Sequence, residues 1–155
     1  MIEHIYVRLN PVGGYPPHDS EELDAEPLDA GDYIIRSVPV WARDLSREDR
    51  VATVVVDGRR YVDRIIEDGG HTTVRVVLFS QDPTSEETCL AELDHGVRDA
   101  GAAFGTPPFP GLWPIDVPPR AKFRRLEALL ERGRDRGWWD IEYGTVAPEH
   151  RASTQ

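Results

Sequence analysis

The sequence predicts an α+β fold in which a β-rich N-terminal segment packs on a ferredoxin-like βαββαβ unit. Residues 1–68 are typical of about four short strands, and from His71 onward the apolar pattern gives the order strand, helix, strand, strand, helix, strand. We therefore expect a β-rich N-terminal subdomain at 1–68, a ferredoxin-like subdomain at 69–146 and a polar tail at 147–155. The hairpin between 59–67 and 71–79 crosses the boundary, so we also expect the halves to share a sheet or core.

The N-terminal strands follow from alternation and from turn residues. Strands are expected at 4–10, 33–40, 51–56 and 59–67, and the acidic stretch 19–32 is expected to be a loop or a short strand around 23–28. Pro39 lacks an amide donor, so it belongs at the edge or end of a strand. The pair Asp57-Gly58 is the strongest hairpin signal, because glycine tolerates the positive φ of a tight turn.

The C-terminal elements follow from a change of period. A strand at 71–79 precedes a helix that begins near Pro83 and ends before Gly101. Short strands are expected at 102–106 and 112–117. Pro118-Pro119 then opens a second helix, because proline is tolerated in a first turn, and the helix ends at Gly133 or Gly137. The last strand is expected at 138–146. The predicted buried helix positions are Leu90, Leu93, Val97, Phe123, Leu126, Leu129 and Leu130.

Composition excludes several classes of function. The formal net charge is -10, from 18 basic and 28 acidic residues. Such a protein repels phosphate backbones, so we expect no nucleic-acid partner, whereas a basic protein partner is permitted. No apolar run approaches the roughly 20 residues of a membrane span, and the N-terminus does not resemble a signal peptide, so we expect a cytoplasmic protein without a membrane partner.

Metal and cofactor chemistry finds no support in the residue pattern. Cys89 is the only cysteine, which excludes an intramolecular disulfide and a multi-cysteine metal site. The five histidines are scattered, and none stands at a ligand spacing from another. The Gly-rich run before His71 leads into a strand and not into a helix, unlike a phosphate-binding loop. We therefore expect neither a metal nor a cofactor.

Six short segments follow one another along the chain: 14–17 (GYPP), 22–28 (ELDAEPL), 38–42 (VPVWA), 70–76 (GHTTVRV), 115–119 (IDVPP) and 137–143 (GWWDIEY). Taken in this order they cover about residues 5 to 145, and they resemble a bacterial family known as domain of unknown function 4265. The resemblance implies a soluble bacterial protein. It carries no established activity, cofactor or catalytic residue.

His71 is the candidate catalytic residue, because histidine can act as a general base near neutral pH. Its candidate partners are Asp116, Glu142 and Tyr143. In a ferredoxin-like sheet the strands that carry His71 and Asp116 are central, adjacent and antiparallel, so the start of one strand lies near the end of the other. The alternative is that His71 only fixes the geometry of a turn.

Charged and aromatic residues supply the candidate binding surface. The candidate acidic residues are Asp19, Glu21, Glu22, Asp24 and Glu26. The helix at 119–136 is locally basic, so it is either an anion-binding face, a contact for the acidic segment, or a solvated surface. Trp138 and Trp139 are neighbours on a predicted strand and face opposite sides. One is expected under the helices, and the other under the N-terminal half or exposed as an interface anchor.

The sequence favours a non-catalytic acidic interaction protein that binds a basic protein partner, in an immunity-like or accessory role. The alternative is a small enzyme with His71 as general base and a carboxylate partner in a cleft between the subdomains. A third possibility is a small-ligand sensor whose pocket walls are tryptophans. The sequence gives no expectation for the oligomeric state.

Overall fold

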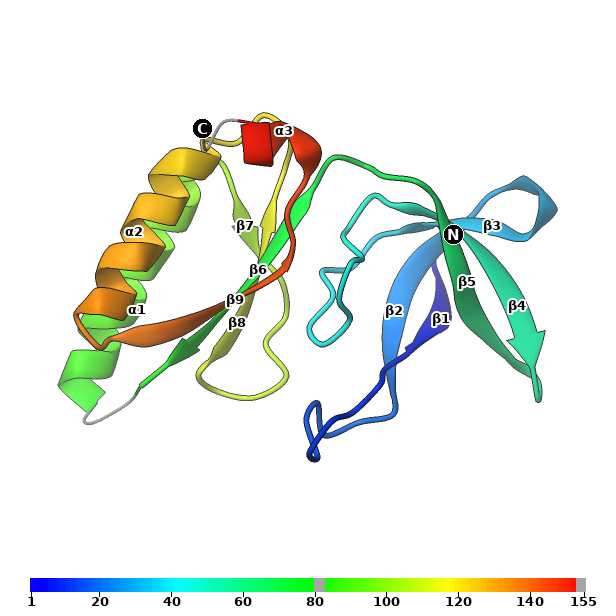
Figure 1. Ribbon diagram of the computed structural model, residues 1–155, viewed down its shortest axis with the longest axis horizontal. Helices are drawn as coiled ribbons and strands as arrows, with labels where there is room; N and C mark the ends of the chain where they lie inside the picture. Colours follow the sequence, from blue (N-terminus) through cyan, green and yellow to red (C-terminus); the bar gives the residue numbers. More distant parts are fainter. Residues whose placement is uncertain (80–82, 153–155) are drawn as a thin grey trace.

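The computed structural model describes residues 1–79 and 83–152 and shows a strand-rich α+β protein. A closed barrel and a four-stranded sheet lie side by side, and two helices cover the sheet on the side away from the barrel (Figure 1). The predicted α+β class and the β-rich N-terminal segment are confirmed. No helix in the described ranges is long and apolar enough to cross a membrane.

Five consecutive strands form the barrel. They are β1 (Glu3–Arg8), β2 (Ser20–Pro27), β3 (Asp32–Ile35), β4 (Arg50–Val56) and β5 (Arg59–Glu67). Neighbours in the chain pair antiparallel, and a parallel contact between β1 and β5 closes the barrel. The barrel interior is apolar because alternate residues, such as Ile5, Leu23 and Ile35, point inward and are fully buried. The predicted hairpin at Asp57-Gly58 is confirmed, with positive φ at both residues.

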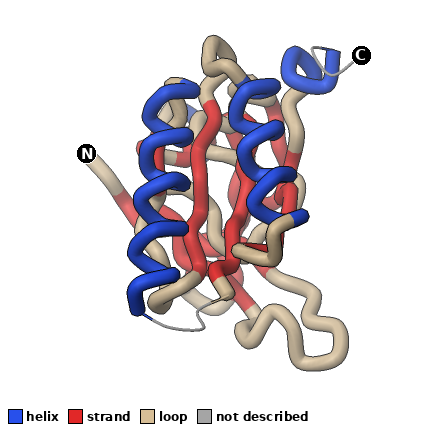
Figure 2. The backbone as a smooth tube through the Cα atoms, turned by 90° about the vertical axis from the view of Figure 1, so that its left-hand side faces the viewer, coloured by secondary structure: helices blue, strands red, loops and turns tan. Residues whose placement is uncertain are grey.

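The second half is a sheet with two helices on one face. Its strands are β6 (Thr72–Leu78), β7 (Ala103–Phe104), β8 (Leu112–Val117) and β9 (Trp139–Thr145), in the antiparallel order β7-β8-β6-β9. The helices α1 (Pro83–Ala100) and α2 (Phe123–Asp135) lie side by side over this sheet (Figure 2). Gly133 lets α2 approach β9, because a Cβ there would lie 2.0 Å from the Trp139 ring.

The two halves have separate sheets and separate apolar cores, so the expectation of a shared sheet or core is wrong. One buried cluster fills the barrel, and the other lies between the sheet and its helices. The reason is the chemistry of the sheet face that looks toward the barrel. Thr73, Arg75 and Asp116 stand there, and these polar side chains need hydrogen-bond partners that an apolar core cannot offer.

Several element boundaries differ from the sequence prediction. The strand predicted at 33–40 ends at Ile35, and the chain then leaves the barrel as a loop that reaches the sheet. Helix α2 begins at Phe123, because residues after Pro118-Pro119 first make a turn in which the Ala121 amide donates to the Pro118 carbonyl. In the predicted polar tail, residues Pro148–Ala152 form the short helix α3.

Candidate functional site

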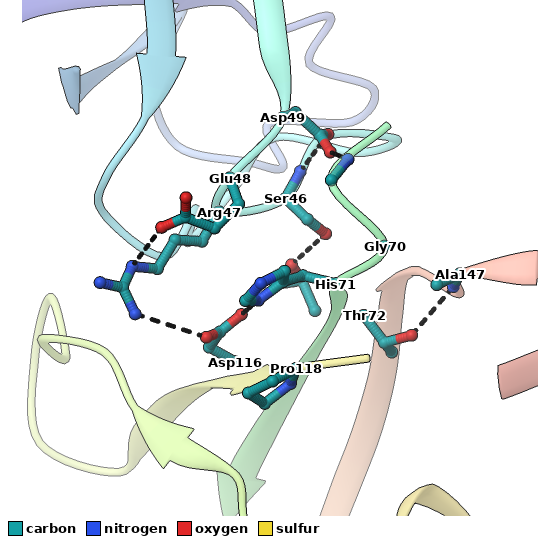
Figure 3. A network of polar contacts seen from close by, with 12 residues as sticks. Ser46, Arg47, Glu48, Asp49, Gly70, His71, Thr72, Asp116, Pro118 and Ala147 are labelled. Atoms are coloured by element: carbon teal, nitrogen blue, oxygen red, sulfur yellow. Dashed lines mark hydrogen bonds and ion pairs between the residues drawn. The ribbon is translucent and has the colours of Figure 1, made fainter. Parts of the chain in front are cut away.

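The barrel and the sheet meet at a polar junction formed by loop 42–49 and the barrel-facing side of the sheet (Figure 3). Alternation along β6 turns Thr73 and Arg75 toward the barrel. Asp116 of β8 faces the same way, because it is the direct cross-strand partner of Thr73. All three side chains are buried. This junction contains the predicted candidates His71 and Asp116.

The structure brings His71 and Asp116 together. His71 Nδ1 lies 2.8 Å from Asp116 Oδ1, and the two side chains are 12% and 2% exposed. A carboxylate oxygen only accepts hydrogen bonds, so Nδ1 carries the hydrogen and donates it. The other ring nitrogen, Nε2, has no partner within 1–79 and 83–152 and is not among the fully buried polar atoms. An oriented imidazole with one accessible nitrogen can accept or deliver a proton.

The second carboxylate oxygen of Asp116 faces loop 42–49, which we call the barrel loop. Arg47 Nη1 lies 3.7 Å from Asp116 Oδ2, and Arg47 Nε lies 3.7 Å from Glu48 Oε1 (Figure 3). One carboxylate therefore links the imidazole of the sheet half to a guanidinium of the barrel half. The link holds the chain segment that enters β6 against the loop that leaves β3.

Asp49 orders the same loop from the other side. Its carboxylate accepts hydrogen bonds from the amides of Ser46 and Gly69, both at 2.9 Å. Burial raises the pKa of Asp49, and the hydrogen bonds from the two amides partly oppose this shift, because they lower the pKa. The hydroxyls of Ser46 and Thr73 then join loop and sheet at 2.6 Å. These contacts fix the position of His71, which follows Gly69-Gly70.

Arg75 is the largest polar side chain in the junction and is almost fully buried. Its guanidinium donates to the Ala42 carbonyl of the barrel loop and, at 3.0 Å, to Glu142 of β9. Burial lowers the pKa of Arg75, while the negative charge of Glu142 opposes this shift. Glu142 therefore serves as the counter-ion of a buried arginine, and the structure does not pair it with His71.

Tyr143 lies on the opposite face of the sheet from Glu142. Its ring packs edge-on against Phe123 of α2, with the ring centroids 6.5 Å apart. Burial, together with the nearby carboxylates of Glu131 and Glu127, raises the pKa of Tyr143 to about 12. Of the four predicted catalytic residues, the structure thus brings together His71 and Asp116, and it places Glu142 and Tyr143 elsewhere.

A cleft of about 430 Å³ opens between the barrel and the edge strand β7. Its charged lining consists of four carboxylates and two guanidiniums: Glu21, Glu22, Asp24, Asp116, Arg36 and Arg47. Val38, Val40 and Phe104 supply apolar wall, and Gly105 and Thr106 follow β7 along the rim. The predicted acidic segment therefore forms one wall of a cavity, and the sheet half forms the other.

The five acidic residues predicted for binding have different surroundings. Asp19 is exposed, and Glu22 and Asp24 are each 52% exposed, with His4 Nδ1 3.1 Å from both carboxylates. Glu26 is paired with Arg36, which also pairs with Glu48. Glu21 is buried, and its carboxylate accepts the amides of residues 40, 41 and 42 at 2.6 to 2.9 Å. Of these five, only Asp19, Glu22 and Asp24 are exposed carboxylates that pair with no guanidinium in residues 1–79 and 83–152.

The structure also locates the adjacent tryptophans Trp138 and Trp139 and the basic helix α2. Trp139 is fully buried under the helices and donates from Nε1 to the Leu130 carbonyl at 2.9 Å. Trp138 is half-buried beneath the guanidinium of Arg136, 4.9 Å from its ring centroid. Helix α2 lies on the side of the sheet away from the barrel (Figure 1), so it is not the counterpart of the acidic segment.

His150 is a buried polar residue that the sequence analysis missed. Its Nδ1 lies 2.5 Å from the Thr72 hydroxyl and its Nε2 lies 3.1 Å from the Pro118 carbonyl oxygen. The ring also stacks on Phe123, with the centroids 4.9 Å apart. The pair Pro148-Glu149 was the available signal, because proline at the first position and an acidic residue in the first turn are typical of a helix start.

Metal-binding geometry is absent from the described ranges: no group of three or more His, Cys, Asp or Glu side chains there is arranged to hold an ion. The single thiol, Cys89, is buried against the helix core, and burial raises its pKa. A buried thiol with a raised pKa is a poor nucleophile.

Comparison with known proteins gives a family and a fold relative. A family model described as "Domain of unknown function (DUF4265)" matches residues 21–141. None of the curated proteins matches the chain. A solved structure titled "Novel crystal structure of a hypothetical protein from Neisseria gonorrhoeae" is similar, with a TM-score of 0.77 and 18% sequence identity over 95% of this chain and 96% of that chain. At this sequence identity, the similarity shows that the two proteins share a fold.

Proposed function

The chain belongs to the DUF4265 family, and because that description names no activity we propose its function from the geometry of the cleft. We propose a non-catalytic interaction protein that binds a basic segment of a protein partner between β2 and β7, in an immunity-like or accessory role. The observation that carries the proposal is the pair of half-exposed carboxylates, Glu22 and Asp24, on the cleft wall.

Charge balance within the cleft supports this proposal. The two arginines that line it already face carboxylates, Arg36 those of Glu26 and Glu48, and Arg47 those of Glu48 and Asp116. Among the residues that the structure describes, the carboxylates of Glu22 and Asp24 pair only with the imidazole of His4, which carries a charge only when protonated. The accessible charge in the cleft is therefore negative, and a lysine or arginine side chain complements it.

Shape also supports a peptide segment as the ligand. Strand β7 is the edge of its sheet, and it forms the wall opposite the acidic strand β2. An edge strand presents backbone groups that an extended segment can pair with, while side-chain pockets supply specificity. Val38, Val40 and Phe104 offer apolar contacts for the stems of long basic side chains.

The experiment is a selection of peptides from a random library displayed on phage, with the wild-type protein as bait. Peptides that contain Lys or Arg should be enriched, and the double variant Glu22→Gln/Asp24→Asn should bind them roughly 2- to 30-fold more weakly, as expected for two exposed ion pairs. The matched control is Glu87→Gln/Glu92→Gln on α1, which removes the same charge far from the cleft. Selection of no basic peptides, or equal binding by both double variants, would refute the proposal.

A second candidate function is general-base catalysis by His71, and the 2.8 Å contact with Asp116 favours it. A buried carboxylate that orients one imidazole nitrogen leaves the other free to take a proton. Of the predicted partners, Asp116 orients His71 in this proposal, and Glu142 and Tyr143 have no role in it. The test is turnover of a panel of acyl, phosphoryl and glycosyl esters, which should be lost in His71→Gln. Turnover that survives this change, or no turnover on any ester class, argues against catalysis.

We further infer that residues 69–146 form a ferredoxin-like subdomain and 1–68 a separate β-rich subdomain. Support comes from the element order β6-α1-β7-β8-α2-β9 and from the strand order β7-β8-β6-β9 with antiparallel neighbours. In this arrangement β6 and β8 are the central strands, which is what makes the His71–Asp116 contact geometrically natural.

A further inference from the structure

A second cavity, which shares no residue with the acidic cleft, lies at one end of the barrel. Its volume is about 510 Å³, within the size range of small-molecule sites. The end of β1, the turn that follows it and loop 41–44 form its walls. It is lined by Arg8, Leu9, Asn10, Val12, Tyr15, Pro16, Trp41, Arg43 and Asp44. We call it the aromatic pocket, because Tyr15 and Trp41 form its largest walls.

Aromatic contacts hold these walls in place. The rings of Tyr15 and Trp41 meet edge to face, with their centroids 5.8 Å apart. Trp41 also contacts Phe109 at 6.2 Å and His18 at 5.9 Å, so its indole is fixed by three rings from two different loops. Tyr15 remains 49% exposed. The pocket therefore offers a held indole and an accessible phenol against which a flat ring can stack.

Two arginines line the pocket. Neither the Arg8 nor the Arg43 side chain makes a hydrogen bond or ion pair with any residue in the described ranges, although the chain has 28 acidic residues. The guanidinium of Arg8 stacks on the Tyr61 ring, 4.2 Å from its centroid, which leaves the N–H edge of the guanidinium free. Asp44 is the single carboxylate in the lining, so the pocket has a positive balance.

The buried guanidinium of Arg75 lies behind the pocket, where it is paired with Glu142. Its Nε is buried without a hydrogen-bond partner in the ranges that the structure describes. Arg75 and Arg43 both lower the pKa of the Tyr15 hydroxyl, although burial, the largest effect, and the charge of Glu142 leave it raised. The two guanidiniums therefore lie within electrostatic reach of the Tyr15 hydroxyl. Because Glu142 offsets the charge of Arg75, the positive charge that the pocket offers to a ligand comes from Arg43 and Arg8.

We propose that the aromatic pocket binds a small organic anion, namely a planar ring that carries a carboxylate or phosphate group. The ring packs against Trp41 and Tyr15, and the anionic group accepts hydrogen bonds from Arg43 and Arg8. Guanidinium groups suit this role because their N–H donors match the geometry of both carboxylate and phosphate. A neutral ring would leave the arginines without a counter-ion, and an inorganic anion would leave the aromatic walls unused.

The test is isothermal titration calorimetry with phenyl phosphate and benzoate as probes. At least one of the two should bind, and inorganic phosphate and benzyl alcohol, which lack the ring and the charge respectively, should bind more weakly. Arg43→Gln should weaken binding of the ring-bearing anion by roughly tenfold or more, since it removes a charge-assisted hydrogen bond. Arg120→Gln, an exposed arginine before α2, is the matched control and should bind as the wild type does.

The indole N–H resonance of Trp41 gives the location of binding independently of affinity. It should shift on titration with the ring-bearing anion, while the resonance of the buried Trp139 should stay unchanged. The proposal is overturned if neither phenyl phosphate nor benzoate binds at millimolar concentration. It is also overturned if Arg43→Gln binds as tightly as Arg120→Gln, or if benzyl alcohol binds as tightly as the better of the two anions.

Discussion

At the scale of single residues, the positions of charged groups depend on which face of a strand each occupies. Along β2, Glu21 points inward and Glu22 outward, so neighbouring carboxylates have opposite roles. Along β9, Glu142 faces the barrel and Tyr143 faces α2, and strict alternation already implies that both cannot face His71. The pair His71–Asp116 was predictable, because both residues stand at the adjoining ends of antiparallel neighbours. The capture of three amides by Glu21 was not, since those amides lie about 20 residues away in the chain.

Glu21 should contribute to stability, whereas its neighbour should not. In Glu21→Gln the amide nitrogen replaces one of the two accepting oxygens, so a buried backbone N–H loses its acceptor. We expect a loss of about 1–3 kcal/mol in the free energy of unfolding. Glu22→Gln is the matched control, and being exposed it should change this free energy by less than about 0.5 kcal/mol. Urea denaturation measures both, and equal losses would contradict the assigned role of Glu21.

Tyr143 should make the stability depend on pH in the alkaline range. Its pKa is raised from 10.0 to about 12 in the folded protein, so between these values the unfolded chain releases the proton while the folded chain keeps it. The stabilisation from the protonated phenol is complete below pH 10, and it declines as pH rises toward 12. The unfolding free energy of the wild type should therefore fall relative to that of Tyr143→Phe over this range. A constant difference would show that the folded and unfolded states release this proton alike.

At the scale of elements, local pattern predicts those elements whose causes are local. Strand β8 and the turn at Asp57-Gly58 lie where the sequence places them, because alternation and turn chemistry act over a few residues. The end of β3 and the helix α3 depend on distant partners. Glu21 draws the amides after Pro39 out of the barrel, and Thr72 and Pro118 hold His150 in place. No window of neighbouring residues contains that information.

Gly105 tests the contact between the loop that follows β3 and the edge of the sheet. A Cβ at this position would lie 2.6 Å from Val38 Cβ and 3.3 Å from Pro114, so Gly105→Ala should force the two halves apart. Overpacking of this kind costs about 1–3 kcal/mol of unfolding free energy. Adding Val38→Gly, which removes that Cβ, should recover part of the loss, with a coupling above about 0.5 kcal/mol in a double-mutant cycle. Strict additivity of the two changes would mean that Val38 and Gly105 do not touch in solution.

At the scale of the whole molecule, the acidic charge is distributed unevenly, and this distribution separates two cavities. The cleft between β2 and β7 has accessible carboxylates, whereas the aromatic pocket has two arginines that pair with no carboxylate in the described part of the chain. Composition revealed the net charge but not this division, because the division arises from folding distant segments together. Ala42 lies between the two cavities. Its amide donates to Glu21, which lines the cleft, and its carbonyl accepts from Arg75. The next residues, Arg43 and Asp44, line the aromatic pocket.

The junction should make the barrel and the sheet unfold together. A unit of about 60 residues buries only about 60% of its unfolded surface and is marginally stable, so the barrel depends on its contacts with the sheet. We expect the fluorine resonances of 5-fluorotryptophan at Trp41 and at Trp139 to disappear at the same urea concentration. Replacing Arg75 with Met removes the bonds to the Ala42 carbonyl and to Glu142, while it keeps an apolar stem of similar length. The barrel loses its bond through Ala42, whereas Glu142 of the sheet is 33% exposed and can be hydrated, so the Trp41 midpoint should fall further than the Trp139 midpoint. Separate midpoints in the wild type, or an equal fall of both in Arg75→Met, would show that the junction does not couple the two halves.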